Sequence, residues 1–445
     1  MSVPADILFS IFDLLADDRP TQQAGCLTAK VLTSHCQRHL FRSPSFNFMV
    51  DVGPDAQDTV PVSNALACFA QALESNPCLG SYVLSFGTIV GGYTQSSEDQ
   101  TKYRQGNIDV TALLRQTFSK LGNLESIHLQ AGISHATPLI QVVRFEELIE
   151  IPFPNLRSLR LVGPGVSIPD PLYSRHFSWP ATLQTLVIDD CAQKRPPEGK
   201  SVAGSVKTRC FTYVDSGRMP FTPKSLLDSV DPQSIHHFHF SSNKEPDRLR
   251  ALEILSKSSP NLTSFTYAVP ERSAGGIHTR RNRFFHKDNT HIFASLIGLE
   301  TFGFQVEASD FLFNAAHPER TDYRTLPRFM ASTFCSTALS AIPNITTLEI
   351  KIIQMYSVDV TTEFVDYFID IDDYLARGPF PRLNKVRLVF NVRKSWLEKE
   401  EITTSEMRES FQLWANAAFV ESKEKRGLEA EVEVNDHEGL YARYG

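Results

Sequence analysis

The sequence predicts an α/β protein in which three short N-terminal helices precede a curved solenoid of parallel strands with helices on its outer side. Two patterns carry this prediction. One is a helical periodicity of apolar residues in the first forty positions, and the other is a short apolar phrase that recurs along the rest of the chain. With 445 residues, 42% of them hydrophobic, the chain is long enough to bury one or several large cores.

The first helical pattern begins near Pro4. Ile7, Ile11 and Leu15 recur at helical spacing on one face, with Leu8 beside it. Proline is tolerated in the first turn of a helix because the N–H that it lacks has no partner there. We therefore expect an amphipathic helix from about residue 4 to residue 15.

Two further helices are expected before residue 45. Pro20 interrupts the first pattern, and Thr21 can then cap a second helix that carries Ala24, Leu27 and Val31. The polar stretch 33–38 leads into the third. Periodicity alone leaves two roles open for these helices, because they can dock a partner or only cap the N-terminal end of a repeat array.

The recurring phrase has the form apolar-x-x-apolar-x-apolar, and it predicts a short buried strand at each copy. Degenerate copies begin at Val83 and Thr208, and the 25–27-residue spacing around the second is the length of one leucine-rich repeat. The eight clear copies begin at Leu124, Leu156, Leu183, Ile235, Leu262, Leu299, Ile345 and Leu383.

Helical patterns lie between the phrases, so the repeating unit is a strand followed by a helix. In such a solenoid no unit buries its own apolar face, and each neighbour supplies the rest. We expect the strands to lie side by side and parallel. The helical patterns centre on Phe69, Leu114, Leu252, Phe368 and Phe411.

Side chains between the apolar positions of each phrase point to the opposite face of the sheet, the concave face of a solenoid. This face is polar and becomes charged toward the C-terminus, as expected for protein recognition, although a merely solvated sheet would look similar. The candidate target-binding residues are His128, Arg160, Asp189, His237, His239, Gln305, Glu349, Lys351, Lys385 and Arg387.

Composition and motifs favour a protein partner over other functions. A net charge of −7 gives no basic field for nucleic acid or membrane, and the seven cysteines, without a C-x-x-C pair, suit the cytoplasm or nucleus. His237 and His239 lack a nearby third metal ligand in sequence. The acidic run 366–373 is read as a solvated helix face. We expect no enzyme activity, no metal and no cofactor, since catalytic motifs are absent from the sequence.

The N-terminal segment resembles the F-box of fungal proteins, through Pro4-Ala5-Asp6-Ile7-Leu8, Ile11-Phe12, the segment 26–30 and the segment 37–42. The resemblance implies that residues 1–45 dock the Skp adaptor of a cullin ubiquitin ligase through Pro4, Ile7, Leu8, Ile11 and Phe12. It also places Leu15, Leu27 and Val31 inside the helical bundle. Leu32 stands where the family usually has a tryptophan.

Residues 46–445 resemble the loose leucine-rich repeats of fungal F-box proteins, including the lead-in from Leu73 to Val83. The implied function is the substrate-recognition subunit of an SCF-type cullin ubiquitin ligase in ubiquitin-dependent degradation, which binds an unidentified protein target. The alternative is a leucine-rich-repeat-like scaffold without a ubiquitin role, whose N-terminal helices act only as a cap.

Overall fold

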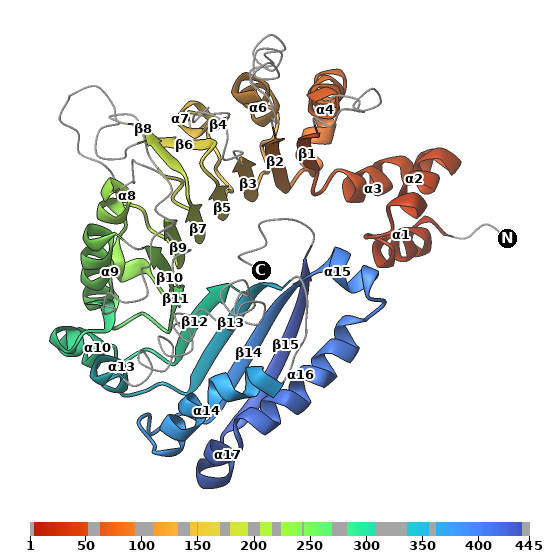
Figure 1. The fold of residues 1–445 in the computed structure, drawn as a ribbon. Helices are drawn as coiled ribbons and strands as arrows, with labels where there is room; N and C mark the ends of the chain where they lie inside the picture. Colours follow the sequence, from red (N-terminus) through yellow and green to blue (C-terminus); the bar gives the residue numbers. More distant parts are fainter. Residues whose placement is uncertain are drawn as a thin grey trace. The chain divides into compact units, whose positions relative to one another are not determined.

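The computed structural model describes residues 4–51, 63–93, 110–131, 143–148, 150–169, 179–194, 205–215, 224–242, 244–268, 283–307, 336–355 and 362–437. The chain divides into two compact units. The first contains residues 1–208 and 219–230, and the second contains residues 209–218 and 231–445. Both are α/β, with helices lying along one side of parallel strands (Figure 1).

The first unit begins with three short helices, α1 (Ala5–Leu14), α2 (Arg19–Thr28) and α3 (Lys30–Leu40). Five strands follow in the spatial order β1 (Ser45–Asp51), β2 (Ser85–Tyr93), β3 (Ser126–Ala131), β5 (Ser158–Val162) and β7 (Thr185–Asp189), each parallel to its neighbour. The helices of this unit that follow α3 are α4 (Ser63–Ser75), the 3-10 helix η1 (Pro77–Tyr82), α6 (Val110–Phe118), α7 (Phe145–Leu148) and α8 (Lys224–Ser229).

The second unit has seven strands, β9 (Cys210–Asp215), β10 (His237–Ser242), β11 (Ser264–Ala268), β12 (Thr301–Glu307), β13 (Thr347–Met355), β14 (Lys385–Arg393) and β15 (Glu429–His437), again parallel in this order. The helices are α9 (Glu245–Ser258), α10 (Thr290–Ala294), α13 (Thr337–Ser340), α14 (Thr362–Ala376), α15 (Lys394–Lys399), α16 (Thr404–Ala418) and α17 (Val420–Arg426). Short 3-10 helices lie at Pro232–Ser234, Arg283–Phe285 and Lys287–Asn289.

The predicted parallel pairing of phrase strands is confirmed within each unit, because equivalent phrase positions are register partners. Ile127 pairs with Leu159, which pairs with Leu186. Phe265 likewise pairs with Phe302 in the second unit. Both degenerate copies also form strands, β2 and β9. All five of these side chains are fully buried, so each row forms a continuous layer of the core.

Three features of the strand arrangement were not predicted. β1 and β15 lack the phrase, although both alternate apolar and other residues as strands do. A second parallel sheet in the first unit contains β4 (Val143–Arg144), β6 (Val166–Pro169) and β8 (Ala192–Lys194). Its strands are too short to give a periodic signal.

The predicted interior of the three-helix module was wrong. Leu27 is 88% exposed, and Val31 and Leu15 are exposed as well. Thr28 ends α2, and Ala29 is extended (φ −148°, ψ 126°), so the helical phase restarts at residue 30. Residues on either side of this break therefore do not share a face. Asp18, and not Thr21, caps α2, because its carboxylate accepts a bond from the Thr21 N–H at 3.2 Å.

The interior of the module instead forms around Gly25, and it includes Leu32, the residue at the family's tryptophan position, which is buried. A Cβ on Gly25 would lie 2.5 Å from the Phe12 ring and 2.7 Å from the Cys36 Sγ, so only glycine allows the helices this close. Buried Gln22 donates hydrogen bonds from Nε2 to the carbonyl oxygens of Phe12 and Leu15, at 2.7 and 2.9 Å. These bonds join α2 to the C-terminal end of α1.

The acidic run on α14 contains one residue that the sequence analysis placed incorrectly. Asp372 is buried rather than solvated. Its carboxylate accepts hydrogen bonds from the N–H groups of Glu421 and Ser422, at 2.8 and 2.9 Å. These are the first free N–H groups of α17, so Asp372 caps that helix from a neighbouring one.

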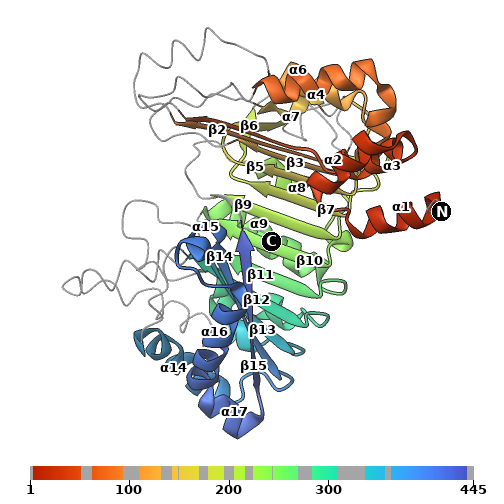
Figure 2. The ribbon, with the colours of Figure 1, turned by 90° about the vertical axis from the view of Figure 1, so that its right-hand side faces the viewer.

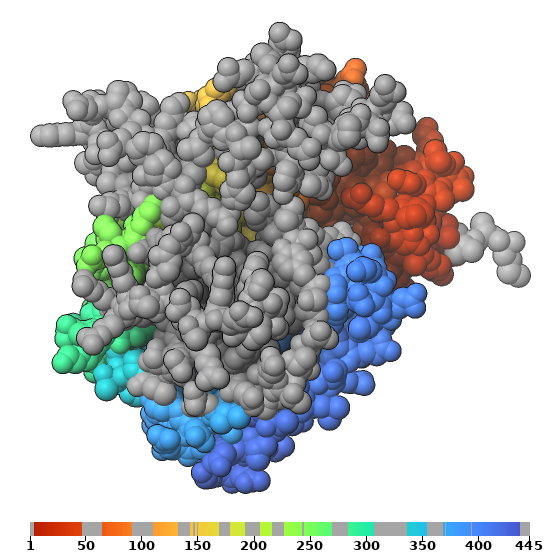
Figure 3. Space-filling view, viewed as in Figure 1, coloured from red at the N-terminus to blue at the C-terminus, as the bar shows by residue number. Residues whose placement is uncertain are grey.

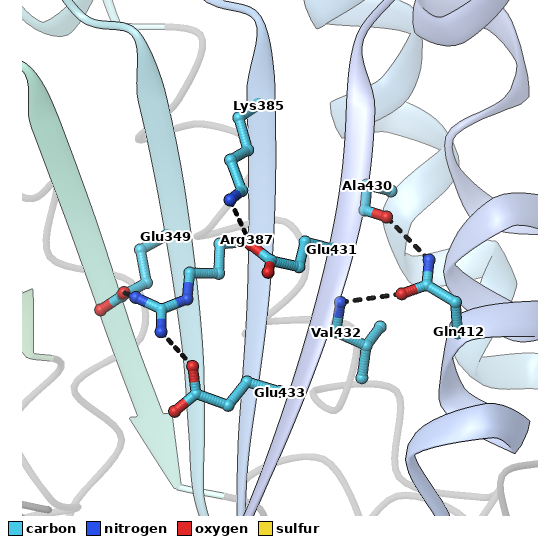
Figure 4. Close-up of polar contacts among 8 residues, drawn as sticks. All are labelled: Glu349, Lys385, Arg387, Gln412, Ala430, Glu431, Val432 and Glu433. Carbon is cyan, nitrogen blue, oxygen red and sulfur yellow. Dashed lines mark hydrogen bonds and ion pairs between the residues drawn. The ribbon is translucent and has the colours of Figure 1, made fainter.

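β15 is the last strand of the second unit's series, and a side chain covers part of its open edge. Gln412 on α16 donates from Nε2 to the Ala430 carbonyl at 2.7 Å and accepts from the Val432 N–H at 3.0 Å (Figure 4). The amide thus reproduces the two bonds of a neighbouring strand, which protects the edge from pairing with another chain.

Candidate protein-binding surfaces

The first candidate surface, here called the docking face, consists of Pro4, Ile7, Leu8, Ile11 and Phe12 on α1 and its N-cap. α1 packs on α3, and no residue of α1 is buried. Ile7 is 50% exposed and Ile11 45% exposed, whereas Leu8 and Phe12 are partly buried. The helices lie open on the surface in the space-filling view (Figure 3).

The other end of the module joins the first strands of the unit. α3 packs against η1, and the Phe41 ring stacks on Phe69 of α4 with centroids 6.3 Å apart. Phe46 contacts Phe69 and Phe86 in turn, at 5.2 and 5.5 Å. The module is therefore held to the strands and helices that follow through α3 and residues 41–46, while α1 lies away from this connection.

The second candidate surface is the polar side of β3 and β5. His128 and Arg160 are register partners on adjacent strands, and both side chains are partly buried. Burial lowers the pKa of His128 to about 4, and the positive charge of Arg160 adds to the shift. The imidazole is consequently neutral at physiological pH, and it offers hydrogen bonds rather than charge.

The third candidate surface is an ion-pair row on β13, β14 and β15, made of Glu349, Arg387, Glu433, Lys385 and Glu431. Arg387 Nη1 lies 3.1 Å from Glu349 Oε2, and its Nη2 binds Glu433 (Figure 4). Lys385 binds Glu431. Only Glu349, Lys385 and Arg387 were expected from the sequence, because the two glutamates lie on the unpredicted strand β15.

Electrostatics within the ion-pair row keep its members charged. Burial by itself would lower the pKa of Arg387, but the hydrogen bond to Glu433 and the nearby carboxylates raise it above the usual value. Burial would raise the pKa of Glu433, yet hydrogen bonds from Asn435 and Arg387 lower it. The row is thus a pattern of alternating charge that a complementary charged protein surface can match.

Two of the ten expected target-binding residues are not accessible. Asp189 and Gln305 are only 2% and 3% exposed. Asp189 ends β7 at a turn where Asp190 has a positive φ of 50°, and its carbonyl accepts the Gly163 N–H at 2.7 Å. Gln305 lies between Ala268 and Lys351 on the adjacent strands. Residues flanked on both sides are buried even on the polar face.

The histidines of β10 differ in exposure. His237 is exposed, and burial is the first cause of its lowered pKa, followed by the charges of His236 and Arg209. Burial also lowers the pKa of partly buried His239 to about 3, with a contribution from Lys351. Among the residues that the structure describes, neither histidine belongs to a group of three metal-ligating side chains.

No protein-family model matches the chain, and no curated protein matches it. Within the described part of the chain, no helix combines the length and apolar character that crossing a bilayer requires.

Proposed function

We propose that this chain is a non-enzymatic substrate receptor of an SCF-type cullin ubiquitin ligase, in the cytoplasm or nucleus. In this proposal the docking face binds the Skp adaptor, and the polar strand faces hold a protein target. The observation that carries it is the exposure of Ile7 and Ile11 on a helix that packs on α3. Exposed aliphatic side chains one turn apart favour burial by a partner.

The N-terminal resemblance supplies the identity of that partner. The exposed isoleucines coincide with the positions that contact the adaptor in fungal F-box proteins. Parallel strands with helices along one side fit the leucine-rich-repeat-like solenoid that the resemblance assigns to residues 46–445. The accessible parts of the polar faces, including the ion-pair row, then form the target surface, which small buried polar groups and balanced charge suit for specificity.

The second candidate function is a repeat scaffold without a ubiquitin role. It is favoured by the packing of α3 against η1 and by the Phe41–Phe69 stack, which are the contacts expected of a terminal cap. A cap needs α3, but it gives no reason for the exposed isoleucines of α1. The two functions are therefore separated by substitutions on α1.

The deciding experiment measures binding of purified Skp adaptor to the full-length chain and to the variants Ile7→Asp and Ile11→Asp. We expect each substitution to weaken adaptor binding at least tenfold, because an aspartate in a buried apolar interface loses its hydration without a partner. Thermal unfolding should change little, since exposed positions tolerate polar side chains.

Leu413→Asp is the matched control, because Leu413 is an exposed leucine on α16 in the second unit. It should leave adaptor binding unchanged. If the parent chain does not bind the adaptor, or if Leu413→Asp weakens binding as much as Ile11→Asp, the ligase function is wrong. If Ile11→Asp instead destabilises the fold by several kcal/mol, α1 belongs to a cap and the scaffold function is favoured.

A further inference from the structure

Three side chains with metal-binding groups converge between α1 and α3. Asp13 lies near the C-terminal end of α1, and His35 and His39 lie four residues apart, on one face of α3. The Nε2 atoms of His35 and His39 lie 2.9 and 2.8 Å from the same oxygen, Asp13 Oδ1. Among the described residues, this is the one group of three such ligand atoms, all within 4.8 Å of one another.

The spacing of these atoms is close to that of a zinc site. Zinc binds imidazole nitrogens and carboxylate oxygens at about 2.0–2.2 Å, so ligand atoms of a tetrahedral site lie about 3.3 Å apart. The two nitrogen-to-oxygen distances need to lengthen by less than about 1 Å to reach this value. Exposed Asp13 can make this adjustment by rotating its side chain.

The surroundings suit a metal site as well. The His35 and His39 side chains are only 14% and 12% exposed, so water competes weakly for their nitrogens. The Phe9 ring stacks on His35 with centroids 4.5 Å apart, which fixes the orientation of that imidazole. The hydrogen bond from His39 lowers the pKa of Asp13, so the carboxylate is deprotonated and ready to bind a cation.

We infer that Asp13, His35 and His39 form a binding site for one Zn²⁺ ion, with water completing the coordination. The ion would link the C-terminal end of α1 to α3, in addition to their packing. A direct consequence is that zinc restricts the motion of α1, the helix whose N-terminal part carries Ile7 and Ile11. The inference concerns metal binding alone and does not depend on the proposed ligase function.

The experiment titrates Zn²⁺ into metal-free full-length chain, followed by calorimetry, and repeats it with Asp13→Asn, His35→Gln and His39→Gln. We expect one equivalent to bind the parent chain with a Kd of micromolar or below. Each substitution removes a direct ligand, so the affinity should fall by more than the roughly 10–100-fold typical of outer-sphere changes.

Two controls exclude other ligands. His237→Gln removes an exposed histidine beside His236 on β10, and Cys26→Ser removes a thiol near Cys36 within the same helices. Both variants should bind zinc as the parent chain does. Circular dichroism of each variant checks that the helices are retained.

Hydrogen exchange tests the location without any substitution. Zinc should slow amide exchange in peptides of α1 and α3, and leave α16 unchanged. The inference is overturned if the parent chain binds no stoichiometric zinc, if Asp13→Asn and His39→Gln bind it unchanged, if either control variant loses it, or if exchange in α1 does not respond.

Discussion

The polar rows of β3–β5 in the first unit and of β13–β15 in the second occupy equivalent positions beside similar apolar rows, yet they treat charge differently. In the first unit, His128 lies beside Arg160 and responds by losing its proton. In the second, Arg387 lies between Glu349 and Glu433 and remains charged. The comparison shows that a shared strand phrase fixes the core but leaves the electrostatics of the polar face free to vary.

The largest expected effect tests whether the two cores are in fact alike. Leu159→Ala in the first unit and Leu348→Ala in the second should each reduce the free energy of unfolding by roughly 2–5 kcal/mol, because both side chains are fully buried. Chemical denaturation of the full-length chain measures the loss. Thr185→Ala and Thr347→Ala, on the polar face, are the controls and should cost far less. Equal losses in leucine and threonine variants would mean that the facing of the strands is inverted.

The next effect concerns pH and the polar row of the first unit. The pKa of His128 is about 4 in the folded chain and about 6.5 when unfolded. Between these values the unfolded chain binds a proton that the folded chain does not, so stability falls as pH falls from about 6.5 toward 4. The loss between pH 7 and pH 5 should be about 2 kcal/mol.

Denaturation at pH 7 and pH 5 measures this loss, and His128→Gln should remove it. Arg160→Gln should reduce it only in part, because burial is the first cause of the shift. His239 titrates in the same window, so His239→Gln should remove a separate contribution. In the ion-pair row, the pKa of Glu433 is lowered from 4.5, so its stabilising contribution is lost only as pH falls below that value. An unchanged acid response in His128→Gln would contradict the assigned origin.

A smaller effect is expected at the edge of β15, a feature of the second unit. Gln412→Ala removes two hydrogen bonds to the strand backbone and should cost about 1 kcal/mol, because water can replace them at an edge. Amide exchange in β15 should accelerate locally. Gln412→Glu can still accept from Val432 but cannot donate to Ala430, so its effect should be intermediate. If Asn416→Ala, on the same helix, accelerates exchange equally, the amide is not the cause.

The smallest effect concerns the charges of the ion-pair row. Glu433→Gln should cost less than about 1 kcal/mol, since the pair with Arg387 is partly exposed and Arg387 keeps Glu349 as a partner. Any loss should shrink in high salt, because ions screen accessible charges. Denaturation at low and high salt tests this. A loss well above 1 kcal/mol that salt does not change would show that the row stabilises the fold more than a solvated surface does.

The sequence predicted the apolar rows well and the accessible surfaces only in part. The phrase positions 127, 159, 186, 238, 265, 302, 348 and 386 all lie in parallel strands, because strand periodicity is local and every copy repeats the same burial. Exposure of the intervening residues depends on neighbours. Asp189 and Gln305 have the same alternation as Arg160, yet they are buried. The candidate surface was therefore too large on those strands and too small at β15.

The N-terminal helices show the same division. Their number and the exposed face of α1 follow from periodicity, and Ile7 and Ile11 are exposed as expected. The interior could not be read in this way, because the extended residue Ala29 separates two helical phases. Gly25 and Leu32 carry no periodic signal that distinguishes them as core positions. The convergence of Asp13 with His35 and His39 joins residues more than twenty positions apart, which no local pattern reveals.

By itself, the sequence determined the strand phrase, the helical segments between phrases and the amphipathic first helix, because these depend on the spacing of apolar residues along a few turns or strands. Only the tertiary structure decided which polar side chains are buried, which charges pair and which helix Asp372 caps. Those outcomes depend on distances between residues remote in sequence. Hydrogen bonds and ion pairs act over a few ångströms, so they are fixed only when packing brings the partners together.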